Sequence, residues 1–387
     1  MNLKWMLVLC FILHKNYVIS QLSIENDRCS TPLNGTGLCV VIHRCKPIIT
    51  FKKYVEHSLS QENSDLFKKY TCGNERNILK VCCPKNASEI ERLERGTFSR
   101  VEGSISERNV SDVTSHKNLG LLPKDCGHIQ DSKLISGTAA QLFEFPWTAL
   151  IYHRKSQGLQ FICAGAVINE RYILTAGHCL YSLNFSSAGV RLGEHDLRTN
   201  SDCDKMNTTC ASPVQDVGIE CIIVHQGFKK MKFEHDIGLI RLSTKLKFNN
   251  NVAAICLPVT QESINYNLSN QVVTVASFGL NQIGKVLSNL ERNEVSLIEK
   301  KECEKFYANV SLISEGHFCA EFKNRETFCG VDSGGPLQVP MFLHGEIRAV
   351  QQGISSFGVR ICGVKGYPDG FTRVSYYMKW ILDNISP

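Results

Sequence analysis

Residues 332–336 read Asp-Ser-Gly-Gly-Pro, and this stretch decides the fold together with two segments upstream. Residues 175–179 read Thr-Ala-Gly-His-Cys, and residues 235–239 read His-Asp-Ile-Gly-Leu. A serine hydroxyl is a poor nucleophile at neutral pH, so it needs an imidazole to take its proton and a carboxylate to orient that imidazole. The segments supply these groups in the chain order His178, Asp236, Ser333. Each segment alone is weak evidence, but the three together predict a nucleophile with its base.

This combination resembles the chymotrypsin/trypsin family of serine proteases, whose triad runs in the same order and is the worked template for this chemistry. The resemblance covers residues 134–387, about two thirds of the chain. It implies that His178 is the general base, Asp236 the orienting acid and Ser333 the nucleophile. Ser356 then corresponds to the family serine that supports the buried aspartate. The implied fold is all-β, with two six-stranded antiparallel barrels and the site in the cleft between them.

Hydrophobic patterns favour the same fold class. Residues 161–168 and 172–175 predict two strands joined by a polar turn, and residues 222–224 and 237–242 are further apolar runs. Helix signals are otherwise sparse, which favours an all-β protein. A C-terminal helix over residues 375–385 is predicted to pack on the body through one apolar face. That face consists of Tyr377, Met378, Ile381, Leu382 and Ile385.

The N-terminus resembles a secretory signal. Lys4 precedes an apolar stretch over residues 5–13, and small residues around Ser20 predict cleavage there, so residues 1–20 are assigned to a signal peptide. Their removal takes away two lysines and no acid, which lowers the formal charge from +6 to +4. That charge is too mild to suggest a nucleic-acid partner. No segment is long enough to predict a membrane span.

Cysteine and asparagine patterns also indicate secretion. The chain has 18 cysteines, which predict disulfides and an oxidising compartment. Asn-X-Ser/Thr motifs predict a glycoprotein, although each motif is weak evidence by itself. They begin at Asn34, Asn86, Asn109, Asn184, Asn207, Asn267 and Asn309.

Six cysteines lie in residues 29–83, a segment too short to be held by its own core. Six cysteines allow fifteen pairings, and sequence alone does not choose among them. The spacing, which closes with Cys82-Cys83-Pro84, resembles the clip domain of arthropod proteases. The resemblance implies the pairs Cys29–Cys82, Cys39–Cys72 and Cys45–Cys83. Some other small secreted knot is the alternative.

Residues 84–125 are predicted to be a linker. From Asn86 to Lys124 the sequence is polar, charged and poor in aromatic residues. Such a composition predicts a flexible segment that no core retains. The protease domain is then predicted over residues 134–387.

Resemblance also implies the disulfides of the catalytic part. One pair braces the histidine loop, one ties the nucleophile loop to the pocket wall, one tethers the pro-segment to the catalytic domain, and two are further intradomain pairs. They are, in that order, Cys163–Cys179, Cys329–Cys362, Cys126–Cys256, Cys303–Cys319 and Cys203–Cys210. Cys221 is left over, either as a buried thiol in a strand, which we expect, or as an intermolecular bridge.

Residues 133–137, Lys-Leu-Ile-Ser-Gly, occupy the place of the family's activation sequence. Cleavage after Lys133 would create a Leu134 α-amine, and the resemblance implies that this cation pairs with Asp332. A buried ion pair of this kind can act as a switch, because an unpaired buried carboxylate is costly. A lysine at the cleavage point implies a trypsin-like activator. The alternative is an ordinary exposed lysine in a loop.

Val331 departs from the family pattern, which has glycine at this position. By resemblance, the backbone N–H groups of Val331 and Ser333 form the oxyanion hole. The β-branch restricts the backbone, and loss of one donor would lower the rate by about 10²–10³. Either the valine is tolerated and only reshapes the leaving-group side, or the enzyme is impaired. We expect a working but restricted enzyme, because the other active-site residues are all present.

The specificity pocket also departs from trypsin. Thr327 stands where trypsin has an aspartate on the pocket floor, whereas Asp369 stands where trypsin has a glycine on the opposite wall. Gly358 is expected to keep the entrance open. A desolvated carboxylate favours a cation, so cleavage after Arg or Lys is one prediction. If Asp369 turns outward, Thr327 and its neighbour Phe328 favour an apolar residue instead.

Three acids lie in a loop that binds calcium in some relatives of the family: Glu194, Asp202 and Asp204. Oxygen ligands suit calcium, but a solvated acidic loop is the commoner explanation. Calcium is therefore only a possibility, and no organic cofactor is expected.

Together these features predict a secreted clip-domain serine endopeptidase zymogen. By resemblance it would act in an arthropod haemolymph cascade, such as prophenoloxidase activation or a Toll-type immune or developmental pathway. The implied partners are protein substrates such as downstream zymogens, an upstream trypsin-like activator, and serpin inhibitors. The alternative is a non-enzymatic homologue that acts as a binding cofactor. Such homologues usually lack the nucleophile, so Ser333 argues against that role while Val331 keeps it open.

Overall fold

The computed structural model describes the chain in a series of segments that together cover both predicted domains. They are residues 28–49, 51–52, 61–75, 78–85, 90, 113–129, 139–184, 186–199, 201–204, 206, 208–269, 271, 273–279, 287–307, 313–322, 332–358 and 367–387. The chain divides into two compact units, Met1–Glu102 and Gly103–Pro387. No helix within these segments combines the length and the apolar character that a membrane crossing requires. The predicted signal peptide lies outside the described residues.

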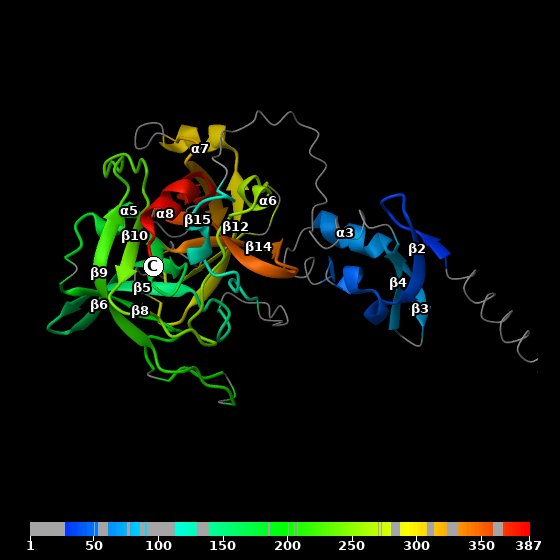
Figure 1. The fold of residues 1–387 in the computed structure, drawn as a ribbon, viewed down its shortest axis with the longest axis horizontal. Helices are drawn as coiled ribbons and strands as arrows, with labels where there is room; N and C mark the ends of the chain where they lie inside the picture. The colour runs from blue at the N-terminus through cyan, green and yellow to red at the C-terminus, as the bar shows by residue number, and fades with distance from the viewer. Residues whose placement is uncertain are drawn as a thin grey trace, which may run out of the picture. The chain divides into compact units, whose positions relative to one another are not determined.

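The N-terminal unit is a small four-stranded sheet (Figure 1). Disulfides link its segments. Its elements are β1 (Arg28–Ser30), β2 (Thr36–Val41), η1 (Ile42–Arg44), α3 (Gln61–Lys69), β3 (Thr71–Glu75) and β4 (Ile78–Pro84). The strand order is β1-β2-β4-β3. Ile48, Phe51, Tyr70 and Val81 are fully buried. A unit of this size cannot bury enough apolar surface to be held by its core alone, which is why its disulfides matter.

The first barrel of the second unit closes in the order β10-β7-β6-β5-β8-β9. Its strands are β5 (Thr148–Lys155), β6 (Gly158–Val167), β7 (Tyr172–Thr175), β8 (Ala188–Leu192), β9 (Gln215–Val224) and β10 (Gly238–Leu242). The short helix α5 (Gly177–Leu180) follows β7 directly. β6 starts three residues earlier than its apolar run predicts, because the hairpin continues through polar residues to the Lys155–Gly158 pair.

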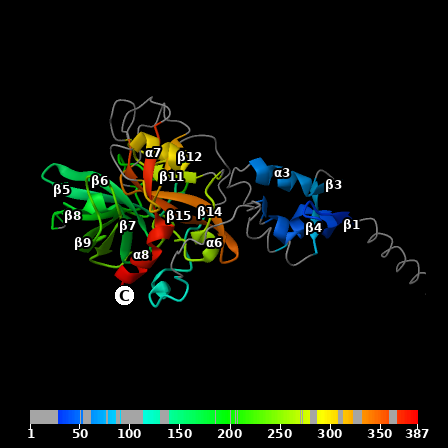
Figure 2. The ribbon, with the colours of Figure 1, turned by 90° about the horizontal axis from the view of Figure 1, so that it is seen from above.

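The second barrel closes in the order β11-β12-β13-β16-β15-β14. Its strands are β11 (Val273–Ser277), β12 (Glu291–Ile298), β13 (His317–Phe322), β14 (Pro336–Leu343), β15 (Glu346–Phe357) and β16 (Asp369–Arg373). The helices α6 (Gln261–Ile264) and α7 (Lys300–Tyr307) lie outside the barrel sheet (Figure 2). Every strand pair of both barrels is antiparallel. The predicted pair of six-stranded antiparallel barrels is therefore confirmed.

A buried hydrogen bond joins the residue before β5 of the first barrel to the second barrel. The indole Nε1 of Trp147 donates to Oε1 of Gln338 on β14 at 2.7 Å. Both residues are almost fully buried. A buried indole N–H that finds an acceptor avoids the cost of desolvation, so this bond fixes how the barrels meet.

The C-terminal helix differs in its first turn from the prediction. Residues Val374–Tyr377 form the 3₁₀ helix η3, and the α-helix α8 covers Met378–Asn384. All five residues of the predicted apolar face are buried, each with 3% exposure or less. The pattern thus identified the packed face, whereas the tighter first turn places Tyr377 inward and Tyr376 in solvent.

The predicted linker is corrected at its C-terminal end, since residues 113–122 pack on the catalytic unit. Val113 is 1% exposed and belongs to the hydrophobic core. The amide of Asn118 donates to the carbonyls of Leu382 and Ile385 at 2.9 and 3.1 Å. His116 lies 2.9 Å from the carboxylate of Asp383. These contacts join segments more than 260 residues apart, so local composition could not reveal them.

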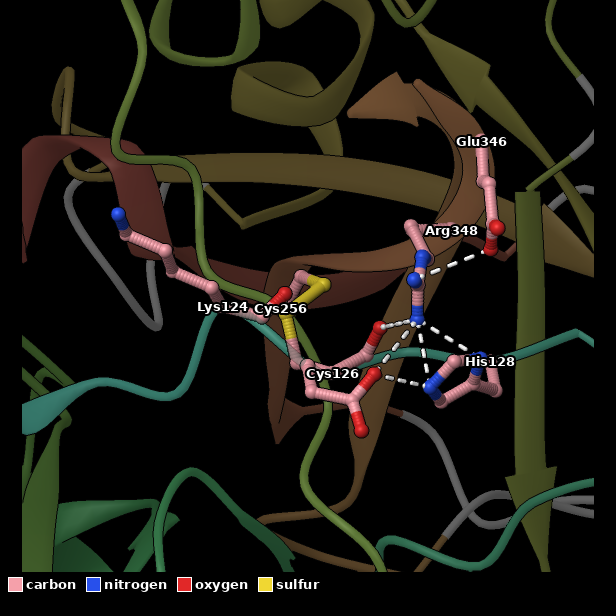
Figure 3. The surroundings of a disulfide bond; sticks show 7 residues. Lys124, Cys126, His128, Cys256, Glu346 and Arg348 are labelled. Carbon is pink, nitrogen blue, oxygen red and sulfur yellow. Dashed lines mark hydrogen bonds and ion pairs between the residues drawn. A yellow bond between two sulfur atoms is a disulfide. The ribbon is translucent and has the colours of Figure 1, made fainter. Parts of the chain in front are cut away.

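A disulfide and a buried arginine anchor residues 125–128 to the second barrel (Figure 3). Cys126 is bonded to Cys256. Arg348 on β15 donates from Nη1 to the carbonyl of Cys126 at 3.0 Å and lies 2.7 Å from Nδ1 of His128. Its Nη2 pairs with Glu346 at 3.0 Å. The arginine side chain is only 8% exposed, so these acceptors compensate for its desolvation.

Gly127 lies at the centre of this anchored segment and has φ 58°. It donates to Ala254 O at 2.8 Å and accepts from Ala349 N at 2.7 Å. A Cβ at this position would stand 2.3 Å from the carbonyl of Ala349. Glycine is therefore required here by both conformation and space.

Candidate active site

The pairing of β7 with β10 brings His178 and Asp236 together. In that ladder Thr175 is opposite Gly238. His178 follows Thr175 by three residues and Asp236 precedes Gly238 by two, so both lie at the same end of the barrel. The antiparallel pairing of these two strands thus brings His178 and Asp236 close together, although they are distant in the sequence.

The Asp236 carboxylate is bound to His178 through both of its oxygens. Its Oδ2 lies 2.8 Å from Nδ1 of His178, and its Oδ1 accepts the backbone N–H of the same residue at 2.7 Å. The aspartate side chain is 0% exposed and the histidine side chain 19% exposed. A carboxylate on Nδ1 holds the imidazole in the tautomer whose Nε2 can take a proton.

Two further side chains hold the aspartate from the second barrel. The hydroxyl of Ser356, near the end of β15, donates to Oδ2 of Asp236. The hydroxyl of Thr372 on β16 donates to the backbone carbonyl of Asp236 at 2.7 Å. Ser356 lies where the family resemblance places it. Thr372 was missed, because a hydroxyl that binds a main-chain carbonyl leaves no motif in the sequence.

Ser333 lies just before β14. Its carbonyl accepts the N–H of Ala164 at 2.8 Å. The Sγ of Cys179 lies 3.5 Å from that carbonyl oxygen and 3.7 Å from Nε2 of His178. The nucleophile segment and the imidazole therefore meet at the Cys163–Cys179 disulfide.

The glycine after the serine, Gly334, allows the segment that carries Ser333 to lie close to Thr175. Gly334 has φ 83°, and a Cβ on it would stand 2.2 Å from Oγ1 of Thr175. Its N–H donates to the carbonyl of Ser355 at 2.8 Å. Only glycine combines this left-handed conformation with so close a neighbour, which explains why the sequence reads Ser-Gly at this point.

Asp332 is anchored to residues at the end of β11. Its carboxylate Oδ2 accepts the N–H of Phe278 at 2.8 Å, and its own N–H donates to the hydroxyl of Ser277 at 2.8 Å. The activation residues Lys133 and Leu134 and the oxyanion residue Val331 lie outside the described residues. The structure therefore places Asp332 beside the nucleophile without showing its predicted partner.

In the predicted pocket wall, Asp369 lies against Gly358. Asp369 begins β16 and is 5% exposed, whereas Gly358 follows β15 and is exposed. A Cβ on Gly358 would stand 1.9 Å from Oδ1 of Asp369. The carboxylate thus occupies the space that the absent Gly358 side chain leaves open. Thr327 and Phe328 lie outside the described residues.

Aromatic side chains border His178. The ring of Phe233 lies 5.9 Å from that of His178 in an edge-to-face arrangement and 5.3 Å from that of Phe357. Phe357 in turn lies 4.9 Å from Tyr307 of α7. Edge-to-face contacts of this kind orient rings as well as bury them. Sequence reasoning missed these contacts, because Phe233 lies between strands while Phe357 ends β15 and Tyr307 ends α7, so the three rings share no periodic pattern.

His235, the residue before Asp236, belongs to a pair of stacked histidines. His235 has φ 51° and stacks on His225 at 4.6 Å, and its Nδ1 lies 3.0 Å from the hydroxyl of Tyr377. Burial, with His235 nearby, lowers the pKa of His225 to about 4. Burial also lowers the pKa of His317 and raises the pKa of Tyr377. His225, His317 and Tyr377 are therefore neutral at physiological pH and pack as aromatic rings.

The disulfides of the described cysteines can be compared pair by pair with the expected ones. The structure has Cys29–Cys82, Cys39–Cys72, Cys45–Cys83, Cys126–Cys256, Cys163–Cys179, Cys203–Cys210 and Cys303–Cys319. Cys329 and Cys362 lie outside the described residues. Cys221 is a free thiol on β9 and is exposed, so the expectation that it is buried is wrong. Its burial was inferred from an apolar run, but β9 turns this side chain outward.

The acidic loop has its oxygens bound to groups of the protein. Asp202 Oδ2 accepts the N–H groups of His195 and Asp196 at 2.8 and 3.2 Å. Both carboxylate oxygens of Asp204 accept from Thr208. Glu194 pairs with Arg191 at 3.3 Å, and burial, together with the Asp202 charge, raises the pKa of Glu194.

This donor set does not fit calcium, which requires several oxygens turned toward one point. Arg191 brings a fixed positive charge into the loop and also binds Asp216 through two nitrogens at 2.9 and 2.8 Å. Among the described residues, the group of potential metal ligands within reach of one ion is Cys163, His178 and Cys179. Two of these form a disulfide and the third is bonded to Asp236, so that group is not a metal site either.

Comparison with known proteins places both units of the chain in families. A family model described as trypsin matches residues 134–381, and one described as the regulatory CLIP domain of proteinases matches residues 29–83. Serine protease grass of Drosophila melanogaster is 28% identical over 97% of this chain and 97% of its own length. Phenoloxidase-activating factor 1 of Holotrichia diomphalia is 32% identical over 96% of this chain and 97% of its own.

A solved structure is also similar. The crystal structure of the Drosophila Grass clip serine protease of the Toll pathway is 29% identical, with a TM-score of 0.61, and the match covers 92% of this chain and 96% of that one. His178, Asp236 and Ser333 all lie within the segment that the trypsin family model matches. The chain therefore belongs to the trypsin family of serine proteases and carries an N-terminal clip domain.

Proposed function

We propose that this protein is the secreted precursor of a serine endopeptidase that is activated by cleavage after Lys133. The observation that carries the proposal is the buried Asp236 carboxylate, which binds His178 through Nδ1 and through the backbone N–H. Ser333 would attack the peptide carbonyl while Nε2 of His178 takes its proton. The imidazolium would then give that proton to the amine, which leaves as the peptide C–N bond breaks. The resulting acyl-enzyme would then be hydrolysed by water with the same imidazole as base.

Activation would work through Asp332. The new α-amine of Leu134 would pair with this carboxylate, which already accepts the N–H of Phe278. The added cation would fix the segment before Ser333 and order the oxyanion donors of Val331 and Ser333. Because the residue before the cut is a lysine, the activator is itself a trypsin-like enzyme.

The test combines cleavage with active-site labelling. Treatment of the full chain with a trypsin-like protease should yield a catalytic chain that begins Leu-Ile-Ser-Gly, and a serine-directed phosphonate should then label Ser333. The Ser333→Ala variant, cleaved in the same way, is the matched control. A correctly cleaved chain that resists the phosphonate would refute the proposal and favour the binding-cofactor role.

We further propose that the enzyme cleaves after Arg or Lys, with Asp369 as the charge that selects them. The carboxylate is buried at the pocket wall beside Gly358, and a buried carboxylate favours a cationic side chain over an apolar one. A panel of fluorogenic substrates with Arg, Lys, Leu or Phe before the cleaved bond tests this. Preference for Leu or Phe would overturn it.

The relatives support a place in a secreted cascade. One bears the name phenoloxidase-activating factor, and the solved structure is of a protease of the Toll pathway. This chain would act in haemolymph on downstream protein zymogens and be regulated by serpins. Asn34, Asn184 and Asn267 are exposed within the described segments, as glycosylation requires.

A further inference from the structure

The hydroxyl of Tyr377 reaches the residue that directly precedes Asp236. Tyr377 ends η3, immediately before α8, and is 3% exposed. Its hydroxyl lies 3.0 Å from Nδ1 of His235, although the two residues are 142 positions apart in sequence. Burial raises the pKa of Tyr377, so the hydroxyl keeps its proton at neutral pH. This contact therefore links the start of the C-terminal helix to the segment that carries the Asp236 carboxylate.

His235 has a backbone conformation that costs free energy. Its φ is 51°, which lies in the left-handed region. Glycine occupies this region freely, whereas a residue with a Cβ atom enters it at a cost. Among residues with a Cβ atom, Asn and Asp tolerate it best, because their short polar side chains can form local hydrogen bonds. A histidine at this position therefore depends on contacts that hold it there.

The conformation of His235 determines where the Asp236 side chain points. The N–H of Ile237 donates to the carbonyl of His235 at 2.8 Å, which makes Asp236 the central residue of a three-residue turn. From this turn the carboxylate reaches Nδ1 and the backbone N–H of His178 at 2.8 and 2.7 Å. If His235 left the left-handed region, the chain would enter the turn in another direction, and the carboxylate would move with it.

Two kinds of contact hold the His235 ring. It stacks on His225 with a centroid distance of 4.6 Å and an interplanar angle of 15°, and Nδ1 of His225 in turn accepts the N–H of Gly227 at 3.1 Å. The hydroxyl of Tyr377 lies against the backbone of Gly316, where a Cβ would stand 2.7 Å from the hydroxyl oxygen. The stack restrains the plane of the His235 ring, and the confined hydroxyl fixes the direction of Nδ1 within that plane.

We propose that Tyr377 is a positioning residue for Asp236: its hydroxyl holds His235 in the left-handed conformation that directs the carboxylate at His178. Tyr377 thus acts through His235 and not on the substrate. Loss of the hydroxyl would let the carboxylate shift away from the imidazole, which would slow the chemical step without weakening substrate binding. The inference rests on the proposed function, because it concerns the turnover that Ser333 would carry out.

The test uses the activated full-length enzyme and a small peptide amide substrate, with kcat expressed per site that the serine-directed phosphonate labels. Tyr377→Phe should lower kcat by about 3- to 10-fold and change KM by less than about 2-fold, as expected for the loss of one hydrogen bond. Tyr376→Phe is the matched control, because it removes the hydroxyl of the neighbouring tyrosine, which is 50% exposed, and it should change neither value. Counting labelled sites separates slower turnover from a smaller amount of folded enzyme.

Substitutions of His235 supply a second test. Because Asn tolerates the left-handed region by itself, His235→Asn should keep kcat within about 3-fold of the wild type, and Tyr377→Phe should cause no further loss in that background. His235→Ala has no such tolerance and should lower kcat by about 10-fold. A Tyr377→Phe enzyme that matches Tyr376→Phe, or a loss that persists in the His235→Asn background, would overturn the inference and leave the proposed function intact. A wild-type enzyme that is neither labelled nor active would refute the proposed function, and the inference with it.

Discussion

The Asp236 carboxylate binds both the imidazole and the backbone N–H of His178, at 2.8 and 2.7 Å. The imidazole cannot rotate out of this position without breaking the charge-assisted bond at Nδ1, and the second bond fixes the main chain that carries it. The two residues are 58 positions apart in sequence. One strand pairing, β7 with β10, is sufficient to bring them together.

Ser356→Ala should lower kcat/KM by about 10- to 100-fold. The hydroxyl of Ser356 donates to the fully buried Asp236, and a hydrogen bond to a charged group contributes about 1.5–3 kcal/mol. Steady-state kinetics of the activated enzyme across pH would measure this. Ser355→Ala, the preceding residue on β15, is the control and should change kcat/KM by less than about 3-fold. Equal losses in both variants would mean a packing effect alone.

Asp369→Asn should reduce cleavage after Arg relative to Leu by about 10²-fold, because removal of one partner of a buried charge pair costs about 2–5 kcal/mol. The measurement is the ratio of kcat/KM values for matched Arg and Leu substrates. Asp383→Asn removes an exposed carboxylate that pairs with Lys379, and it should leave the ratio unchanged. If Asp369→Asn leaves the ratio unchanged as well, the pocket charge is elsewhere.

Arg348→Met should weaken the hold on the N-terminal part of the cleaved chain once the disulfide is removed. In a Cys126→Ser/Cys256→Ser background, the bond from Arg348 to Cys126 O, the Gly127 bridge and the contacts of Asn118 remain. We therefore expect the two cleaved chains to co-elute in gel filtration, and to dissociate at a lower urea concentration when Arg348→Met is added. The exposed Arg198→Met is the control. Separation without any arginine substitution would show that the disulfide alone holds the segment.

Stability should fall between pH 6.5 and pH 4 because of His225. Burial lowers its pKa in the folded state to about 4, whereas the unfolded histidine titrates near 6.5. Within this window the unfolded chain binds more protons, so acid favours unfolding and stability rises with pH. Since the ring is half-buried and solvent screens part of the effect, we expect a loss on the order of 1 kcal/mol.

His225→Phe tests this assignment, because phenylalanine retains the aromatic contacts with His235 and Trp380 but does not titrate. The fall in melting temperature from pH 6.5 to pH 4 should be about 2–4 °C smaller in the variant than in the wild type. Identical pH profiles would assign the acid sensitivity to other groups.

Calcium should not stabilise this protein, since Arg191 supplies the positive charge in the acidic loop. We expect millimolar calcium to change the melting temperature by less than about 1 °C. Arg191→Gln should lower stability by about 1–3 kcal/mol, because it leaves the buried Glu194 without its cation. Arg198→Gln, from the exposed pair with Asp196, should have little effect. A large calcium shift in the wild type would contradict this assignment.

The barrels were predictable because each motif carries local information. Gly334 is required by its conformation and by the approach of Thr175, so the Ser-Gly sequence itself encodes a tertiary contact. The apolar face of the C-terminal helix follows from spacing alone. Such features are visible in a few consecutive residues.

Other parts depend on contacts that no short segment contains. Asn118 binds Leu382 and Ile385 across most of the chain, which is why a polar segment that resembles a linker packs as a structured one. Thr372 binds a main-chain carbonyl, and any residue has one of those. The outward direction of Cys221 depends on the register of β9 against β10, which the apolar run does not determine.

Because Cys126 and Cys256 are covalently linked, a cut after Lys133 would leave both products in one molecule. The two products would remain joined by the disulfide, so dilution would not separate them. The clip domain would therefore stay attached to the enzyme after cleavage, together with any partner or surface that it binds. The amount of active protease at a surface would thus depend on how much precursor was bound there before cleavage, and not on how fast a free catalytic domain diffuses.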